Sequence, residues 1–162
     1  MPDVVLKAVE ADDLVFFFEH QTDVQANEMA AFGSKHPRDK AAFYSKWQRL
    51  MENPEIVCRA VMAETHVAGY IAFFEQLGKP SISYWIGRPF WSMGIATEAV
   101  RQFLQVIVER PLYARVALTN LGSVQVLTKN GFKQLAKENS YSEALEKMVE
   151  EAVFSLEQDH YV

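Results

Sequence analysis

Hydrophobic residues recur at helical spacing in two long stretches of the chain. In residues 95–109 the apolar side chains return every three or four positions, which predicts a helix with a broad apolar stripe packed against a sheet. A second stripe predicts a helix that begins near Pro37 and Asp39 and ends at Asn53-Pro54. The residues that define the two stripes are Ile95, Ala96, Ala99, Val100, Phe103, Leu104 and Ile107, and Phe43, Tyr44, Trp47, Leu50 and Met51.

Alternation of apolar and polar residues predicts strands in several other segments. Residues 4–10 alternate, and residues 55–87 are predicted to form three antiparallel strands joined by short polar turns. Residues 112–119 alternate again, and Phe132 begins a further strand-like piece. Strands that alternate with helices after a meander indicate a mixed sheet with helices on its faces. Short helices are expected at Leu14–His20 and between Asn120 and Gly131, whereas residues 22–34 are ambiguous.

The C-terminal segment gives two conflicting signals. Leu145, Met148, Val149, Ala152, Val153 and Leu156 follow helical spacing, whereas the run VEEAVFSLE could equally form a final strand. Periodicity alone favours a helix slightly.

Composition predicts one globular domain over residues 1–162, with 49% hydrophobic and 23% charged residues. The net charge of −5 disfavours nucleic acid as a partner. Cys58 is the single cysteine, which excludes an intrachain disulfide and fits a reducing compartment. No apolar run is long enough for a membrane span, so a cytoplasmic location and no membrane partner are expected. The four histidines are scattered, which predicts no metal site.

The stretch RPFWSMGIATEAV, residues 88–100, joins a predicted strand to a predicted helix through a turn that contains Gly94. The first N–H groups of a helix lack partners and carry partial positive charge, so such a turn can hold a phosphate. Two familiar phosphate loops are excluded, because the chain has no GxxxxGK[ST] and no GxGxxG followed by an acidic residue.

Two linked motifs carry a more specific signal. YWIGRPFWSMGIATEAV, followed by YARVALTNLGSVQVLTKNGF, resembles the Gcn5-related N-acetyltransferase (GNAT) superfamily, and most resembles its ribosomal-protein N-terminal acetyltransferases. The resemblance implies an α/β (α+β) fold with a mixed, mostly antiparallel central sheet of about six to seven strands. It also implies a sheet that is splayed between the fourth and fifth strands, helices on both faces and a strand as the final element.

The resemblance implies that acetyl-coenzyme A is bound as co-substrate, with no metal. The loop Trp91–Ala96 would hold the pyrophosphate on backbone N–H groups, so that the ligand itself caps the helix. Arg88, Arg101 and Lys129 are the cations near the motifs. The residues expected to bind the cofactor are Trp85, Ile86, Arg88, Trp91, Ser92, Met93, Gly94, Ile95, Ala96, Thr97, Asn120, Ser123 and Lys129.

The same resemblance implies direct attack of an uncharged amine on the thioester, with an oxyanion donor near Trp85–Ile86. Ser92 replaces the family's usual glycine, which is tolerable if Ser92 has a negative φ. Leu127 stands where many relatives carry a tyrosine acid, and Ser123 is the candidate substitute. The usual acidic base on the fourth strand is not evident. Glu75, favoured for its place on the sheet, Glu138 and Glu143 are possible bases, and Tyr84 is a further polar candidate.

The acceptor is left open between a peptide N-terminus, a polyamine, an amino acid and an aminoglycoside. Aromatic residues of the first helices, together with acids, would suit a cationic amine. The leading interpretation is an N-acetyltransferase, monomeric or homodimeric, that acetylates a small-molecule amine or a peptide N-terminus. The alternative is a non-catalytic coenzyme A-binding module or sensor. The aromatics and acids concerned are Phe16, Phe17, Phe18, Phe32, Phe43, Tyr44, Trp47, Asp12, Asp13, Glu19, Asp23 and Glu28.

Overall fold

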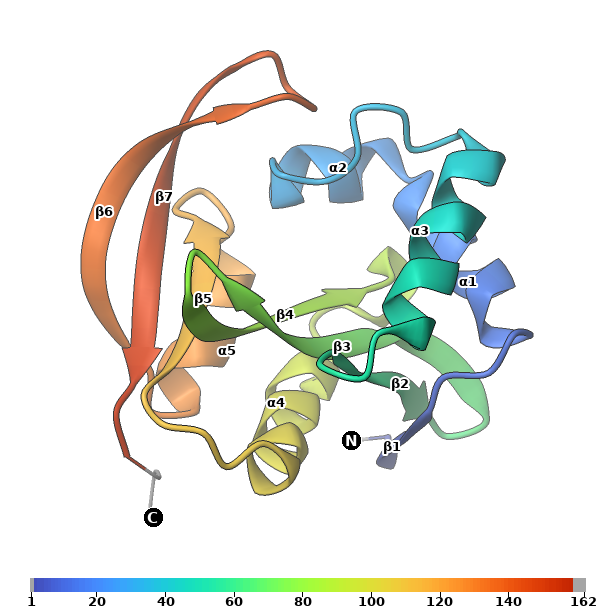
Figure 1. Ribbon diagram of the computed structural model, residues 1–162, viewed down its shortest axis with the longest axis horizontal. Helices are drawn as coiled ribbons and strands as arrows, with labels where there is room; N and C mark the ends of the chain where they lie inside the picture. Colours follow the sequence, from blue (N-terminus) through green and yellow to red (C-terminus); the bar gives the residue numbers. More distant parts are fainter. Residues whose placement is uncertain (1, 159–162) are drawn as a thin grey trace.

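The computed structural model describes residues 2–158 as a seven-stranded sheet with helices on both faces (Figure 1). In chain order the elements are β1 (Val4–Ala8), α1 (Asp13–Gln21), α2 (Val24–Ala30), α3 (Lys40–Glu52), β2 (Val57–Ala63), β3 (His66–Gln76), β4 (Lys79–Ile86), the 3-10 turn η1 (Arg88–Phe90), α4 (Ile95–Val106), β5 (Leu112–Ala117), α5 (Leu121–Lys129), β6 (Lys133–Ser142) and β7 (Lys147–Leu156).

The sheet is mixed, with the strand order β1-β2-β3-β4-β5-β7-β6. Every neighbouring pair is antiparallel except β4 and β5, which run parallel. A single residue pair, Ser81 opposite Tyr113, joins β4 to β5. Beyond that pair the two strands diverge, so the expected splay between the fourth and fifth strands is confirmed.

Two apolar clusters cover the two faces of the sheet. On one face α4 and α5 pack through side chains such as Phe103 and Leu127 against the central strands. On the other face α1 and α3 contribute Phe17 and Trp47, which pack over Tyr70 of β3. In Figure 1 the β6–β7 hairpin curves along one side of the molecule, and its turn approaches α2.

The strongly periodic segments form the elements that their patterns predict. Residues 57–86 form the three antiparallel strands β2, β3 and β4. Asp39 caps α3 through a hydrogen bond accepted from the N–H of Ala42, and Asn120 caps α5 in the same way through Ser123. α4 ends at Val106, three residues before the predicted end at 109. The ambiguous residues 22–34 contain the short helix α2.

The C-terminal segment is a strand, so the helix favoured by periodicity is wrong. β7 pairs with β5 along one edge and with β6 along the other. These pairings join residues far apart in the sequence, and they satisfy backbone groups on both edges of the strand. A helix over the same residues would leave β5 without its antiparallel neighbour. Within residues 2–158, no helix combines the length and the apolar character that a membrane crossing requires.

Candidate active site

A cleft of about 500 Å³ lies where β4 and β5 diverge. The end of β4, the loop that follows it and the first turn of α4 form one wall, and the start of α5 forms the opposite wall. Eleven of the thirteen predicted cofactor positions line this cleft, together with Tyr84 of β4. They are Trp85, Ile86, Trp91, Ser92, Gly94, Ile95, Ala96, Thr97, Asn120, Ser123 and Lys129. Arg88 and Met93 do not line it.

The N-terminus of α4 presents a run of unpaired backbone N–H groups to this cleft. The N–H of Trp91 donates to the Arg88 carbonyl oxygen (3.1 Å), and the next paired N–H is that of Glu98, which donates to Gly94 (3.1 Å). No side chain caps the helix. Within the described chain, the N–H groups of residues 92–97 therefore have no hydrogen-bond acceptor. The uncapped turn expected between Trp91 and Thr97 is present from residue 92 onward.

Ser92 adopts a left-handed backbone conformation, so the condition under which serine would replace glycine without strain, a negative φ, is not met. Its φ is 63°, and that of Gly94, two residues later, is 76°. Left-handed residues let the chain turn sharply, so that successive N–H groups converge on one side and form an anion-binding concavity. Ser92 adopts the conformation for which a glycine would ordinarily be used.

The hydroxyl groups of Tyr84 and Ser123 contact each other where β4 and β5 separate. Their hydroxyl oxygens lie 2.6 Å apart, and the Tyr84 hydroxyl also lies 3.3 Å from the Ser123 carbonyl oxygen. Asn120 holds this end of α5, because its side-chain oxygen accepts a hydrogen bond from the Ser123 N–H. Burial raises the pKa of Tyr84 to about 12, against a smaller opposing effect of the Ser123 hydrogen bond. The phenol therefore keeps its proton at neutral pH.

A second cavity, of about 610 Å³, lies behind this pair. α1, α3 and the loop between α2 and α3 line it together with β3, β4, β5 and β7. Tyr84, Trp85, Asn120 and Ser123 line both this cavity and the cleft. The two spaces therefore meet at the Tyr84–Ser123 pair. We call the second space the acceptor cavity.

The end of β4 directs one backbone N–H toward the open side of the sheet. The N–H of Gly87 donates to Ala68 on β3 (2.8 Å), and successive residues of a strand direct their backbone groups to opposite edges. The N–H and carbonyl of Ile86 consequently face the side where β5 diverges. The indole Nε1 of Trp91 donates to that carbonyl oxygen (2.7 Å), which leaves the Ile86 N–H as the available donor.

Two of the three candidate cations form ion pairs with carboxylates of the protein. Arg88 donates to Asp23 of α2, with Nε and Oδ2 2.6 Å apart, and Arg101 forms two 2.7 Å hydrogen bonds to Glu98. Burial would raise the pKa of the Asp23 carboxyl, yet the Arg88 guanidinium and two backbone N–H groups hold it below its ordinary value. Lys129 lines the cleft, and no carboxylate of the described chain lies within ion-pair distance of it.

The carboxylates proposed as bases do not reach either cavity. Glu75 lies at the exposed end of β3, Glu143 lies in the β6–β7 turn, and Glu138 pairs with Arg115 (2.9 Å) without lining the acceptor cavity. Glu151 of β7 does line it. Its Oε1 accepts hydrogen bonds from Arg115 and from the Ser140 hydroxyl, both at 3.0 Å. Sequence reasoning missed Glu151 because its segment was ambiguous between helix and strand.

The acids of the first helices do not surround the acceptor cavity, whereas some of the aromatics do. Phe17, Phe32 and Phe43 line it, together with Tyr70 and Phe74. None of Asp12, Asp13, Glu19, Asp23 and Glu28 lines it. Asp13 instead forms an ion pair with Lys7 (2.7 Å). Part of the predicted aromatic set therefore surrounds the cavity, whereas the prediction that these acids accompany it is wrong.

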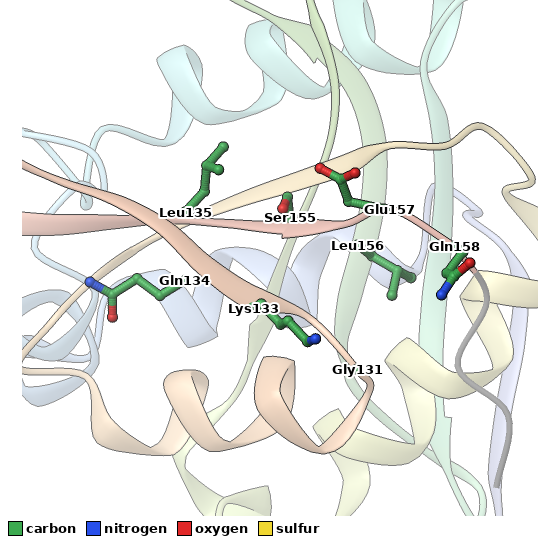
Figure 2. A pocket seen from close by; sticks show the side chains of 8 residues that line it. All are labelled: Gly131, Lys133, Gln134, Leu135, Ser155, Leu156, Glu157 and Gln158. Atoms are coloured by element: carbon green, nitrogen blue, oxygen red, sulfur yellow. The ribbon is translucent and has the colours of Figure 1, made fainter.

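A third hollow, of about 550 Å³, lies where β6 begins and β7 ends. Figure 2 shows its lining side chains spread along the two strands and pointing in different directions rather than converging on one point. It contains none of the predicted site residues. In the part of the chain that the structure describes, no group of three or more His, Cys, Asp or Glu side chains is arranged to hold a metal ion.

Comparisons with known proteins agree with this geometry. Solved structures similar in fold include a microcin C7 self-immunity acetyltransferase, MccE, in complex with acetyl-CoA and AMP (TM-score 0.80, 15% identity, covering 96% of this chain and 92% of that one). A spermidine N-acetyltransferase from Vibrio cholerae in complex with CoA and spermine has a TM-score of 0.80 and 15% identity, covering 96% of this chain and 95% of that one. Mycobacterium smegmatis RimJ in complex with CoA-disulfide has a TM-score of 0.76 and 16% identity, covering 95% and 81%.

The sequence comparisons give one positive result. No curated protein sequence matches the chain. Residues 3–133, which include both motifs through Phe132, match the family described as the acetyltransferase (GNAT) domain. A match over most of the chain, on a sheet that splays at the site and an uncapped helix N-terminus, identifies this protein as a member of the GNAT acetyltransferase family.

Proposed function

We propose that this acetyltransferase transfers the acetyl group of acetyl-coenzyme A directly to a primary amine. The observation that carries the proposal is the position of the Tyr84–Ser123 hydroxyl pair, between the cleft that ends at α4 and the acceptor cavity. A transferase that joins two substrates without a covalent enzyme intermediate must bring both to one point. The Tyr84–Ser123 pair lies at such a point.

The cleft fits the cofactor on the chemistry of its donors. The six free N–H groups of residues 92–97, at the positive end of the α4 dipole, suit a pyrophosphate. Lys129 adds a side-chain cation to the same cleft. Similar folds bind acetyl-CoA in MccE and CoA in the spermidine enzyme, which supports the same ligand here. When bound, acetyl-coenzyme A would supply the acetyl group as a reactive thioester.

The chain's own groups account for the remaining steps. The Ile86 N–H faces the open edge of β4, where it would donate to an oxygen that gains negative charge during transfer. The Tyr84 phenol, protonated at neutral pH, would donate its proton to the departing sulfur. The Ser123 hydroxyl, 2.6 Å away, would orient the phenol through their hydrogen bond, and water would return a proton to the phenolate after the thiol is released.

We assign Glu151 as the carboxylate that takes the proton of the amine, directly or through water. Arg115 and the Ser140 hydroxyl fix one of its oxygens, which leaves Oε2 for the amine. Glu75, Glu138 and Glu143 are not assigned to this role, because none of them lines either cavity.

The test follows release of free thiol from acetyl-coenzyme A in the presence of a panel of primary amines. Saturable, amine-dependent turnover that Glu151→Gln lowers is expected. Glu150→Gln is the matched control, because Glu150 is the exposed neighbour on β7 and pairs with Lys137. Stabilisation of the fold by acetyl-coenzyme A without turnover on any amine would instead establish the alternative, a non-catalytic coenzyme A-binding module.

Three finer features belong to the same proposal. We propose a single domain over residues 1–162, acting in the cytoplasm as a monomer or homodimer, without nucleic acid or membrane as partner. Membership of the ribosomal-protein N-terminal acetyltransferase branch stays a prediction, supported by the likeness to RimJ at 16% identity. A peptide α-amine or a small-molecule amine is therefore the acceptor to be tested.

A further inference from the structure

The acceptor cavity carries a charge opposite to that of the chain as a whole. The protein has a net charge of −5, yet three cationic side chains and two carboxylates line this cavity. The cations are Lys46, Arg49 and Arg115, and the carboxylates are Asp39 and Glu151. A local excess of positive charge in an acidic protein favours an anionic ligand group.

Both carboxylates are already engaged by groups of the protein. Asp39 Oδ1 accepts a hydrogen bond from the N–H of Ala42 (3.0 Å) and caps α3. Arg115 Nη1 lies 3.0 Å from Glu151 Oε1 and 2.9 Å from Glu138 Oε2, so these two carboxylates offset its charge. Among the described residues, Asp39 is then the one lining carboxylate without an ion-pair partner, which is too few for the several cationic centres of a polyamine.

Two of the cations are available to a ligand. Asp39, the N-cap of α3, lines the cavity with Ala42, Phe43, Lys46 and Arg49 of the helix. Phe43, Lys46 and Arg49 recur every three residues, so they share one side of α3. Within residues 2–158 no carboxylate lies at ion-pair distance from Lys46 or Arg49. Among the described residues, Arg49 makes one hydrogen bond, from Nη1 to the Ser45 hydroxyl (2.8 Å), which leaves its other donors for a ligand.

We propose that the acceptor is a small amine that also carries a carboxylate or phosphate, and that Lys46 and Arg49 bind this anionic group. The amine end lies toward Tyr84 and Ser123, and the anionic end lies along α3. A space of about 610 Å³ suits a small molecule of this kind. This inference rests on the proposed function, since it names the acceptor class for the same site.

The experiment compares matched amines that differ in one charge: 4-aminobutyrate with butylamine, and O-phosphoethanolamine with ethanolamine, with spermidine as a polycation. In the wild-type enzyme, kcat/KM is expected to be about fivefold or more higher for the anionic member of a pair. The carboxylate pair and the phosphate pair distinguish the two kinds of anion. Added NaCl should reduce the preference, because the charges that cause it are exposed.

The double variant Lys46→Gln/Arg49→Gln should abolish the preference, because it lowers kcat/KM for the anionic amines much more than for butylamine and ethanolamine. Lys40→Gln is the matched control, since Lys40 is an exposed cation of α3 that does not line the cavity. The single variant Arg49→Lys, with Lys46 unchanged, should keep most of the preference for the anionic amine. A loss of the same size for every amine in the double variant would mean a merely structural role and would overturn the proposal.

Two further outcomes separate this inference from the proposed function. If butylamine or spermidine is acetylated better than the anionic amines, the acceptor class is wrong and the N-acetyltransferase stands. If no amine is acetylated, ligand-observed NMR on the coenzyme A complex measures the binding of 4-aminobutyrate and butylamine. Equal affinities would then overturn the anionic site as well, whereas tighter binding of 4-aminobutyrate that the double variant removes would support it.

Discussion

Ser92 is a non-glycine residue with a left-handed backbone, and its conformation leads to a stability prediction. At φ 63° its Cβ is crowded, which costs an L-residue about 1–2 kcal/mol, while glycine loses about 0.4–1 kcal/mol more backbone entropy on folding. Ser92→Gly should therefore raise the free energy of unfolding by about 0.5–1 kcal/mol in urea denaturation. Ser83→Gly, in the extended strand β4, should lower it. A loss of stability in Ser92→Gly would contradict the assigned conformation.

Tyr84 is the residue on which the proposed chemistry depends most. Removal of its hydroxyl in Tyr84→Phe should lower kcat about 100-fold, the usual loss for a positioned acid, while KM for acetyl-coenzyme A changes little. Because its pKa is about 12, the wild-type acid stays protonated well above neutral pH, so the rate should show no descending limb from Tyr84 below about pH 11.

Tyr113→Phe is the control for that variant, because Tyr113 lies on β5, lines neither cavity and packs under the Lys79 ammonium. Full activity in Tyr84→Phe would remove the phenol from the mechanism and leave the Ser123 hydroxyl as the proton donor.

At the scale of the elements, the end of β4 passes close to Gly69 of β3, and this contact positions the end of β4 at the site. A Cβ placed on Gly69 would lie 1.9 Å from the Trp85 carbonyl oxygen, which no backbone can tolerate without moving. Gly69→Ala should therefore separate the strands and lower the free energy of unfolding by about 3 kcal/mol. It should also weaken coenzyme A binding, because Trp85 and Ile86 line the cleft.

Gly122→Ala is the matched control for this substitution. The nearest atom to its Cβ would be the Asn120 side-chain oxygen at 4.0 Å, and the residue lies in α5. Alanine there should stabilise the protein by about 0.5–1 kcal/mol. Equal losses in the two variants, measured by thermal or urea unfolding, would show that the close approach at Gly69 is not the cause.

The elements that the sequence predicts well are those whose signals are local. The apolar stripe of α4 and the Asn120 and Asp39 caps depend only on residues within a few positions of each other. β7 is different, since Val149–Leu156 satisfies helical spacing and is decided by its pairing with β5 and β6. β6 exposes most of its side chains on the sheet edge, so its polar sequence gives no strong alternation.

At the scale of the whole molecule, the two halves of the site differ in how far the sequence predicts them. The cofactor half is formed by contiguous motifs, so its lining residues follow from the chain directly. The acceptor half combines α3, β5 and β7, which meet only in the folded protein, and Glu151 therefore escaped notice. The pairing of Arg88 with Asp23 could not be predicted for the same reason, because Asp23 lies 65 residues away at the N-cap of α2.

Two phenols whose pKa values burial raises, those of Tyr70 and Tyr84, make the stability of the whole fold sensitive to alkaline pH. Burial raises the pKa of both Tyr70 and Tyr84 to about 12, and nearby Cys58 adds to the effect at Tyr70. In the unfolded chain both would ionise near pH 10, so the protonated folded state is favoured in full below about pH 10. As pH rises from about 10 to 12, the phenols ionise in the unfolded chain before they ionise in the folded protein, which stabilises the unfolded state. The free energy of unfolding should therefore fall by as much as about 2–3 kcal/mol per tyrosine.

Urea unfolding across that pH interval, followed together with phenolate absorbance, measures this loss. Because lysines titrate over the same interval, the informative quantity is the difference between the wild type and Tyr70→Phe, which removes one phenol and should make the decline with pH shallower. Tyr113→Phe is the control for removal of a phenol, since the Tyr113 ring lies on β5 outside the aromatic cluster around Tyr70. Parallel declines in the wild type and Tyr70→Phe would mean that the Tyr70 phenol is already ionised or solvated in the native state. The rings of Phe17 and Trp47 lie 5.2 and 4.8 Å from that of Tyr70, so this result would contradict the apolar packing that these distances describe.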